Sequence, residues 1–416
     1  MAEQYTIAQV AEKLGTTQKA VRRLVASKEL GSTKIGTAYS ISQGDLDSYL
    51  SHQHNGAAPR TYRLMEGQDH STRQAEVVNW ADITPWWDNV PASEMTFVDL
   101  FCGCGGLSKG LEMSGLVGIC GLDFFKEACM TYERNFHHPF INGDIKLQEN
   151  KQAFYDTVSK QLAGRRLNIV AGGFPCQGFS MAGNRIVDDP RNSLYKELLE
   201  IVETLQPDFV ICENVKGLRS MLDGAVERKI IADFRAIGYE VNVTVLCAAD
   251  YYTPQKRERV IFIGNRVGAT NYHPRPILKP SEYITTGQAI ADLMDHPEDE
   301  AFNHVPTRHR PDMAKRMLEL EEGKSLYKGY SDAWKKCPWD EASCTIKENH
   351  GGVNVHPRLP RVLTAREMAR LQSFPDDFIF RGTKNKQLVQ IGNAVPPLLG
   401  KAIGLAVRFS SGDLHE

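Results

Sequence analysis

Residues 95–106 read MTFVDLFCGCGG, and this stretch decides the fold class that we expect. It begins with the apolar pattern of a buried strand and runs directly into a turn rich in glycine. Glycines between a strand and a helix let the backbone approach a ligand closely, as in the first turn of a doubly wound α/β domain. Such a turn alone is shared by many nucleotide-binding folds. The CxC within it has no further Cys or His cluster around it, so we expect no metal site.

The next two predicted strands end in acids. VGICGLD, residues 117–123, is a strand pattern that ends in Asp123. An acid roughly 20 residues beyond such glycines typically accepts hydrogen bonds from ribose hydroxyls. Phe124 follows in a position to stack on adenine, and a third strand end, INGD at 141–144, supplies Asp144 for an adenine amino group. This order predicts an adenosine-containing ligand, which a nicotinamide dehydrogenase would share.

A cysteine at the end of a further strand indicates the chemistry. Residues 167–180 read LNIVAGGFPCQGFS, so the strand ends in two glycines and then Pro175 and Cys176. A thiol at the carboxyl edge of the sheet, beside a cofactor site, can serve as a thiolate nucleophile. The alternative is that Cys176 is a small buried hydrophobic residue, as most of the cysteines here are expected to be. Residues 207–215, PDFVICENV, bring Glu213 to the same edge.

The segment QKRER, residues 255–259, precedes another predicted strand, VIFIGNR. Because side chains alternate along a strand, Gln255, Arg257 and Arg259 are expected to share one face. The alternative is a solvated basic strand end.

Taken together, these segments resemble the DNA (cytosine-5)-methyltransferase family of bacterial restriction–modification systems. The matching segments, in the usual order of the family, are DLFCGCGGLS, Asp123 (where the family often has Glu), NGDI, GGFPCQGFS, ENV, QKRER, RVLTAREMARLQSFPDDF (361–378) and QIGNAVPPLLGKAIG (390–404). They organise the chain from about residue 95 to about residue 410. The resemblance implies an α/β, class I S-adenosylmethionine-dependent methyltransferase fold. This fold is a doubly wound, Rossmann-like sheet with a smaller target-recognition domain.

The resemblance also implies four catalytic residues. The Cys176 thiolate adds to C6 of cytosine, which raises the electron density at C5. Glu213 protonates N3 or hydrogen-bonds to it, and a carboxyl that does so must be shielded from water. Arg257 holds the carbonyl oxygen of the base, and Arg259 supports the loop and Glu213.

The implied cofactor is S-adenosyl-L-methionine, which is converted to S-adenosyl-L-homocysteine. The residues that the resemblance assigns to its binding are Phe101, Gly103, Gly105, Gly106, Asp123, Phe124, Asp144, Ile145, Pro175, Leu194, Asn393 and Ala394. For Phe124, Ile145 and Leu194 the alternative is plain core packing.

A cytosine inside a duplex must leave the base stack to reach such a site. Residues 177–193 resemble the mobile loop of the family, and within it we expect Gln177, Ser180 and Arg191 to bind DNA. Target reading is expected from the stretch 267–360, where Thr345 and Asn349 lie in a polar segment with glycines. We therefore expect a catalytic domain at 95–266, completed by 385–412, and a target-recognition domain at 267–384.

The first 55 residues are predicted to form a helix-turn-helix module. Ile7, Val10, Ala11 and Leu14 have helical spacing, a second helix with basic residues follows, and 34–39 is a candidate hairpin. This resembles the winged modules of excisionases and MerR-type regulators. On the second helix, Lys19, Arg22 and Arg23 are expected to contact DNA, the alternative being a packing or dimerisation module. Residues 56–94 are predicted to be a linker, whose tryptophans Trp80, Trp86 and Trp87 pin it onto the next domain.

Charge and composition narrow the setting. The net charge is −2, but residues 251–280 carry six Lys or Arg against one acid, whereas 282–300 carry six acids and no Lys or Arg. No apolar run is long enough for a membrane span, and the N-terminus lacks a secretory pattern. The nine cysteines show no paired spacing, which favours a reduced compartment. We expect the bacterial cytoplasm, with the protein on nucleoid DNA.

Several alternatives stay open at this point. Double-stranded DNA is the expected partner, and a cognate restriction endonuclease and a dimer through the N-terminal module are further candidates. A tRNA cytosine-5 methyltransferase can share the same catalytic core. A DNA-binding transcriptional regulator with a methyltransferase body is the non-enzymatic alternative. The recognition sequence does not follow from the residues.

Overall fold

The computed structural model describes residues 4–13, 18, 21, 24, 25, 30–35, 38–46, 78–175, 180–182, 185–187, 193–327, 334–347 and 353–414. They belong to two compact units, Met1–Gln74 and Ala75–Glu416. Within these residues, no helix is both long enough and apolar enough to cross a membrane.

The first unit is a small three-stranded sheet with helices. Its elements are β1 (Gln4–Thr6), α1 (Ile7–Lys13), β2 (Thr33–Ile35) and β3 (Ala38–Ser42), and the strand order is β1-β3-β2. The predicted hairpin is confirmed by the antiparallel β2–β3 pair, whereas β1 was not expected. A further helix begins after Ser42, whose Oγ accepts a hydrogen bond from the Asp45 backbone at 3.1 Å. Val10, Val21 and Ile41 are fully buried in its core.

The second unit is built on a seven-stranded sheet of order β12-β13-β11-β8-β5-β6-β7. Strands β7, β6, β5, β8 and β11 run parallel, and β13 runs antiparallel to both β11 and β12. The strands are β5 (Thr96–Leu100), β6 (Val117–Asp123), β7 (Phe140–Asn142), β8 (Ile169–Gly172), β11 (Phe209–Val215), β12 (Glu240–Cys247) and β13 (Glu258–Asn265). Every strand predicted from the sequence is present. The antiparallel β12 was not predicted.

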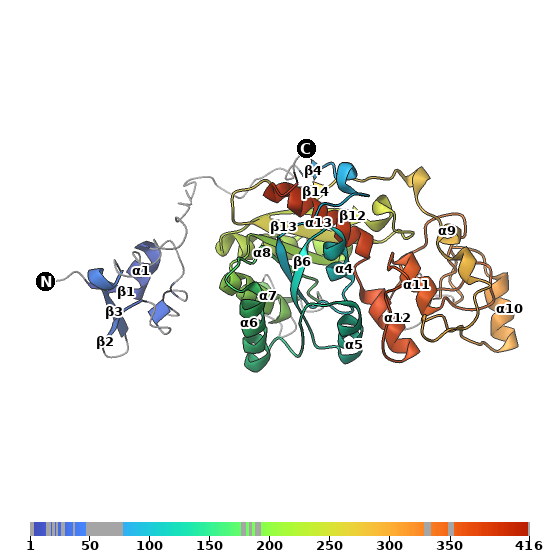
Figure 1. Ribbon diagram of the computed structural model, residues 1–416, viewed down its shortest axis with the longest axis horizontal. Coiled ribbons are helices and arrows are strands. Elements are labelled where there is room, and N and C mark those ends of the chain that lie inside the picture. Colours follow the sequence, from blue (N-terminus) through green and yellow to red (C-terminus); the bar gives the residue numbers. More distant parts are fainter. Residues whose placement is uncertain are drawn as a thin grey trace. The chain divides into compact units, whose positions relative to one another are not determined.

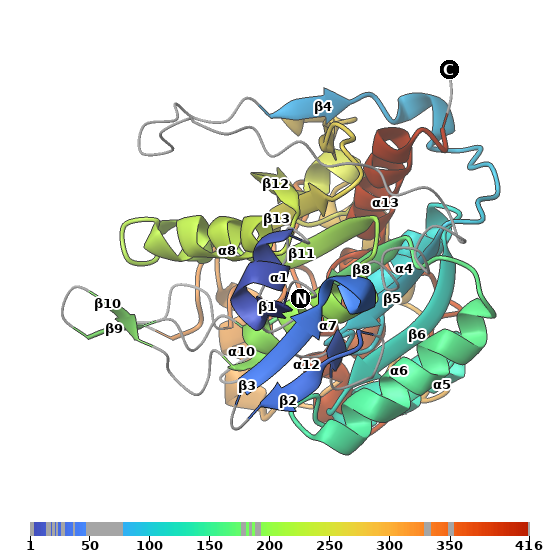
Figure 2. The same ribbon diagram turned by 90° about the vertical axis from the view of Figure 1, so that its left-hand side faces the viewer.

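Helices cover both faces of this sheet, as in a doubly wound fold (Figure 2). On one face Val98 and Leu100 pack with apolar residues of α6 (Gln148–Leu162), α7 (Ser193–Leu205) and α8 (Ala225–Ala236). Phe97, the residue before Val98, points to the other face, toward α4 (Gly106–Met113) and α13 (Pro397–Ser411). The predicted fold class is confirmed.

The C-terminal helix α13 packs against α4 on the same face of the sheet (Figure 1). The two helices approach closely because Gly110 and Gly400 meet where they cross. A Cβ on Gly110 would lie 2.5 Å from the Cα of Gly400. Larger residues would force the helices apart.

A smaller domain surrounds a core of its own. Its helices are α9 (Thr286–Ile290), α10 (Pro311–Glu319), α11 (Ala365–Leu371) and α12 (Lys384–Asn393). Ile290, Met317 and Met368 are fully buried there. The same core includes Tyr132 of α5 (Lys126–Asn135) and Phe136, which directly follows that helix. The smaller domain therefore packs on the domain of the seven-stranded sheet through α5 and Phe136.

Two segments lie elsewhere than their predicted domains. Strand β14 (Tyr272–Pro274), from the stretch assigned to target recognition, pairs with β4 (Asn79–Ala81), from the stretch assigned to the linker. Both strands belong to the unit of the seven-stranded sheet. In that unit Trp86 contacts Phe409 and Trp87 contacts Tyr252, with ring centroids 5.9 and 5.7 Å apart. Trp86 and Trp87 thus pin residues 78–94 as expected, because their rings find apolar partners. Trp80 is 37% exposed.

Candidate active site

One edge of the seven-stranded sheet opens into a cavity of about 830 Å³. Its walls come from the carboxyl ends of β5, β6, β8 and β11, where ligands bind in open α/β sheets. Strand β13 runs antiparallel, so its first residues reach the same edge. Residues 345–347, residue 390 and residues 392–395 complete the lining, the last two groups lying at and just after the end of α12.

On the β5–β6 side, the cavity has an aromatic and an acidic wall. Phe101 has φ +58°, a left-handed conformation that is uncommon for a residue other than glycine and that ends β5 sharply. Asp123 Oδ2 accepts a hydrogen bond from the Gly103 backbone at 2.9 Å, and Oδ1 accepts one from Phe125 at 2.8 Å. Burial raises the pKa of Asp123, and these hydrogen bonds oppose the rise. Phe124 lines the cavity with 70% of its surface exposed.

Most of the predicted cofactor residues line this cavity. They are Phe101, Gly103, Gly106, Asp123, Phe124, Pro175, Leu194, Asn393 and Ala394. Gly105, Asp144 and Ile145 are not among the lining residues. A Cβ on Gly105 would overlap Phe136, so that glycine serves packing. Asp144 is exposed and caps the Lys146 backbone at 3.0 Å, and Ile145 is buried in the core.

Glu213 and Arg259 form an ion pair at the cavity wall, with 2.7 Å between Oε1 and Nε. Both side chains are 13% exposed, which places them at the boundary between the sheet and the cavity. Gly173 leaves the room for this carboxylate, because a Cβ there would lie 3.0 Å from Glu213 Oε2. The neighbouring Asn214 donates to the Phe174 carbonyl at 2.7 Å and so holds the segment that leads to Pro175.

Arg257 lies deeper, with 2% of its surface exposed. Its Nη1 donates to the Ile346 carbonyl at 2.8 Å and its Nη2 to the Gly392 carbonyl at 3.0 Å. Burial, aided by the charge of Arg259, lowers the pKa of Arg257. Its Nε is buried and has no hydrogen-bond partner among the described residues. Arg257 therefore braces Ile346 and the end of α12 against the start of β13.

The alternation predicted for QKRER is observed, although β13 itself begins only at Glu258. Gln255 and Arg257 are buried and Arg259 is half-buried, whereas Lys256 and Glu258 are exposed. Gln255 accepts from the Ile346 backbone at 2.8 Å and donates to Gln372 at 2.7 Å.

Comparisons with known proteins agree with this geometry. Residues 95–408 match the family model described as C-5 cytosine-specific DNA methylase. The chain belongs to this family. It is 36% identical over 329 residues to the Type II methyltransferase M1.HphI of Haemophilus parahaemolyticus, covering 75% of this chain and 86% of that protein. It is 35% identical over 360 residues to M.NgoFVII of Neisseria gonorrhoeae, covering 79% and 92%.

Solved structures resemble this DNA cytosine-5 methyltransferase in fold. An E. coli DNA modification methyltransferase encoded within a prophage has a TM-score of 0.62 at 24% identity, covering 77% of this chain and all of that one. The Entamoeba histolytica methyltransferase EhMeth has a TM-score of 0.56 at 17% identity, covering 78% and all of that chain. Outside the methylase match, residues 5–54 match a helix-turn-helix domain model, as predicted.

Several predicted residues of the methylase lie outside the described residues. They are Cys176, Gln177, Arg191, Asn349, Lys19, Arg22 and Arg23. Ser180 belongs to β9 (Ser180–Ala182), which pairs with β10 (Arg185–Val187). Thr345 lines the cavity, and its Oγ1 donates to the Lys256 carbonyl at 3.0 Å. Pro175, directly before Cys176, also lines it.

Among the cavity residues that the sequence did not single out, one is a buried acid. Asp99 is 1% exposed and lines the cavity. It accepts a hydrogen bond from Ser108 at 2.5 Å, and Ser108 in turn accepts one from Tyr132 at 2.9 Å. Burial raises the pKa of Asp99 to about 7, although the Ser108 hydrogen bond lowers it. A single acid inside an otherwise apolar strand was the available signal.

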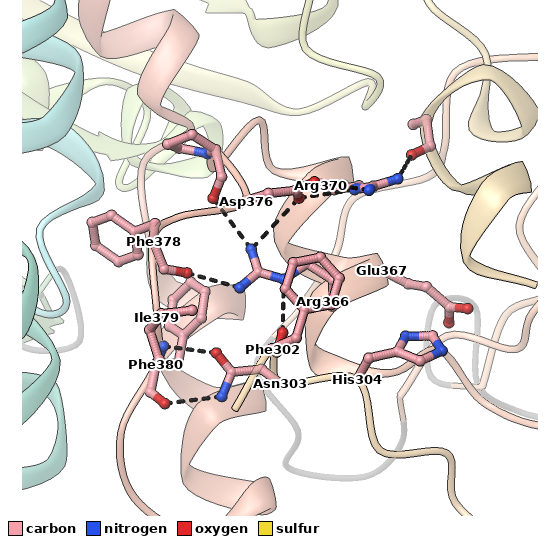
Figure 3. A network of polar contacts seen from close by, with 12 residues as sticks. Phe302, Asn303, His304, Arg366, Glu367, Arg370, Asp376, Phe378, Ile379 and Phe380 are labelled. Carbon is pink, nitrogen blue, oxygen red and sulfur yellow. Dashed lines mark hydrogen bonds and ion pairs between the residues drawn. The ribbon is translucent and has the colours of Figure 1, made fainter. Parts of the chain in front are cut away.

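The segment 361–378, which the family shares, holds the smaller domain together (Figure 3). The buried Arg366 donates from Nε to the Phe302 carbonyl at 2.9 Å and from Nη2 to the Phe378 carbonyl at 2.9 Å. Asn303 exchanges two hydrogen bonds with the Phe380 backbone, at 2.8 and 3.0 Å. Buried charge is satisfied here by backbone carbonyls. The segment therefore has a structural role.

Proposed function

We propose that this DNA cytosine-5 methyltransferase is sequence-specific, uses S-adenosyl-L-methionine, and acts through Cys176 on a cytosine turned out of the duplex. The Glu213–Arg259 pair carries the proposal. It lies in the wall of a cavity that Pro175, the neighbour of Cys176, also lines. A carboxyl beside the segment that leads to Cys176, in the same cavity as Phe124 and Asp123, supports cytosine chemistry next to an adenosine site.

The described residues fit S-adenosylmethionine. Phe124 presents an exposed aromatic face in the cavity, and the Asp123 carboxylate has acceptor capacity beyond its two backbone hydrogen bonds. Phe101 and Leu194 supply apolar contacts, and Gly103 has no atom within 4 Å of the place of a Cβ. When bound, the cofactor supplies the methyl group as a sulfonium electrophile.

The chemistry on the base falls to residues of the chain. Cytosine C5 is a weak nucleophile, so the Cys176 thiolate forms a bond to C6 and the electrons of the 5,6 double bond become available at C5. Glu213 donates a proton or a hydrogen bond to N3 as that addition occurs. The Nε of Arg257, which has no hydrogen-bond partner in the part of the chain that the structure describes, suits a carbonyl oxygen of the base. After C5 has taken the methyl group, loss of the C5 proton restores the double bond and releases Cys176.

Base flipping follows from access, because a thiol and a carboxyl in a cavity cannot reach C6 and N3 inside a duplex. We assign the closing loop to 177–193, with Gln177, Ser180 and Arg191 on DNA, and target reading to the segment of Thr345 and Asn349. The relatives are Type II methyltransferases, which supports a place in a restriction–modification system. Lys19, Arg22 and Arg23 of the helix-turn-helix module would then make a second DNA contact.

Bisulfite sequencing of DNA from an expressing strain tests the proposal. We expect methylated cytosines in one short sequence context, and none with Cys176→Ser. Methylation without a consensus would overturn sequence specificity. A second assay offers the purified enzyme labelled S-adenosylmethionine with either tRNA or DNA. Methyl transfer to tRNA but not to DNA would favour the tRNA alternative.

A further inference from the structure

Among the described residues, three lysines line the cavity: Lys216, Lys256 and Lys347. Lys347 lies in the segment of Thr345, whereas the other two stand at the rim and flank strands β11 and β13. Lys216 follows directly after β11 and begins the 3-10 helix η4 (Lys216–Ser220), and Lys256 lies two residues before β13. Both line the cavity that holds Glu213 and Arg259. Their side chains are 57% and 50% exposed, so both ammonium groups face solvent next to the catalytic groups.

These lysines differ from the arginines beside them. Arg257 is committed to two backbone carbonyls, and Arg259 is committed to Glu213. Of the three basic residues in QKRER, Lys256 therefore has the side chain that remains accessible to a ligand. Lys256 is thus the accessible cation that the basic stretch 251–280 contributes to the cavity. Lys216 joins it from the start of η4.

Each lysine is held by one exposed carboxylate. Lys216 Nζ lies 2.8 and 2.9 Å from the two oxygens of Glu258, and Lys256 Nζ lies 2.7 Å from Glu341 Oε2. The Lys256 ammonium lowers the pKa of Glu341 through this hydrogen bond. Exposed pairs of this kind contribute little to stability, about 0–1 kcal/mol. An ammonium has three N–H donors, and the ion pair adds little stability, so a phosphate oxygen can replace the carboxylate with little loss of stability.

A flipped nucleotide brings such anions to this rim. When its base enters the cavity, the phosphates on either side of it stay in the backbone, outside the cavity. Lys216 and Lys256 offer one cation to each of these two phosphates. We propose that Lys216 and Lys256 bind the phosphates flanking the target cytosine, exchanging Glu258 and Glu341 for phosphate oxygens. This inference rests on the proposed function, because it takes DNA with a flipped base as the ligand.

The exchange has a consequence for selectivity. Glu258 and Glu341 repel DNA, and they neutralise both lysines as long as no phosphate replaces them. Binding that does not place phosphates at the rim therefore gains nothing from Lys216 or Lys256. A duplex with a flipped cytosine gains both contacts.

The salt dependence of DNA binding tests the proposal on the full-length protein. The probe is a fluorescein-labelled duplex that carries the site mapped by bisulfite sequencing, measured by anisotropy in KCl with S-adenosylhomocysteine present. Each phosphate contact contributes about 0.9 to the slope of log K against log salt. We expect Lys216→Gln and Lys256→Gln each to lower the slope by about 0.9, which is about a 3.5-fold smaller loss of affinity over a fourfold rise in salt. Glu258→Gln and Glu341→Gln should bind more tightly than wild type at low salt.

A matched control is Lys229→Gln on α8. Lys229 also pairs with one carboxylate, Asp233 at 2.9 Å, but does not line the cavity. Its slope should equal that of wild type. The proposal would be overturned if both rim lysine variants kept the wild-type slope and bound the cofactor normally in calorimetry. In that case the wild-type enzyme would still methylate DNA, so the proposed function would stand. Lower slopes without tighter binding by the glutamate variants would overturn the exchange. Failure of the wild type to methylate DNA would instead overturn the proposed function.

Discussion

Arg259 holds Glu213 across two antiparallel strands, with its Nε 2.7 Å from Oε1. The register pairs Glu213 with Ile261 and Arg259 with Val215, so the two side chains are diagonal neighbours on one face of the sheet. A charge-assisted hydrogen bond of this kind fixes the orientation of the carboxyl. The second oxygen, Oε2, faces the space left by Gly173.

The role of Cys176 can be tested by Cys176→Ser. A hydroxyl is a much weaker nucleophile than a thiolate, whereas its volume is similar. We expect no methyl transfer from labelled S-adenosylmethionine to DNA, with folding and DNA binding retained. Incorporation near the wild-type level would refute the assignment.

Glu213→Gln keeps the shape of the side chain but cannot donate a carboxyl proton to N3. General acid–base contributions are about 100- to 10,000-fold, so we expect a loss of that order in the rate of methyl transfer. Cofactor affinity measured by calorimetry should survive, because Asp123 remains. Loss of cofactor binding at an unchanged rate would show that the roles of the two carboxyls are exchanged.

Gly173→Ala tests whether the position of Glu213 matters. The added Cβ would lie 3.0 Å from Oε2, so the carboxyl must move. Small misplacements of reacting groups cost up to about 100-fold in rate, and we expect a loss of roughly 10- to 100-fold in kcat. Gly217→Ala is the control, because nothing lies within 4 Å of its Cβ position. Equal kcat values for the two variants would contradict the prediction.

Asp99 makes stability depend on pH. Its pKa is raised from 3.8 to about 7 in the folded protein, mainly by burial. The unfolded chain therefore loses this proton first, and the ionisation disfavours folding increasingly from about pH 4 to about pH 7, with a constant effect above that. Asp99→Asn can still accept from Ser108 but removes this dependence. We expect urea unfolding without cofactor to show that the free energy of unfolding of the variant rises relative to wild type over that pH range, by at most about 4 kcal/mol. A gain that is equal at pH 4 and pH 8 would assign the effect to packing.

Two truncations separate the units. Removing residues 1–55 should leave an active enzyme with the same methylation consensus, because the cavity and the recognition segment lie in Ala75–Glu416. Removing residues 1–94 should destabilise that unit, because β4, Ile83 and Trp87 are lost from its core. Bisulfite sequencing and thermal unfolding check both results. A changed consensus in the shorter truncation would mean that the helix-turn-helix module reads the target.

The sequence by itself determined the parallel strands, the glycine turn and the acids at the strand ends. These are local properties, because strand periodicity and glycine freedom act over a few residues. The order of the family segments then determined the class of enzyme. The alternation of Gln255, Arg257 and Arg259 followed from the same periodicity.

Only the tertiary structure decided which charges are available. Arg257 and Lys256 are adjacent in the sequence and both carry a positive charge. Arg257 is buried against Ile346 and Gly392, whereas Lys256 meets solvent and Glu341. Asp99 lies in the wall of the cavity, and β4 joins the unit of the seven-stranded sheet by pairing with β14. Each outcome depends on contacts between residues far apart in the chain. Burial and desolvation set what a charged side chain can do, and they arise only when the layers pack together.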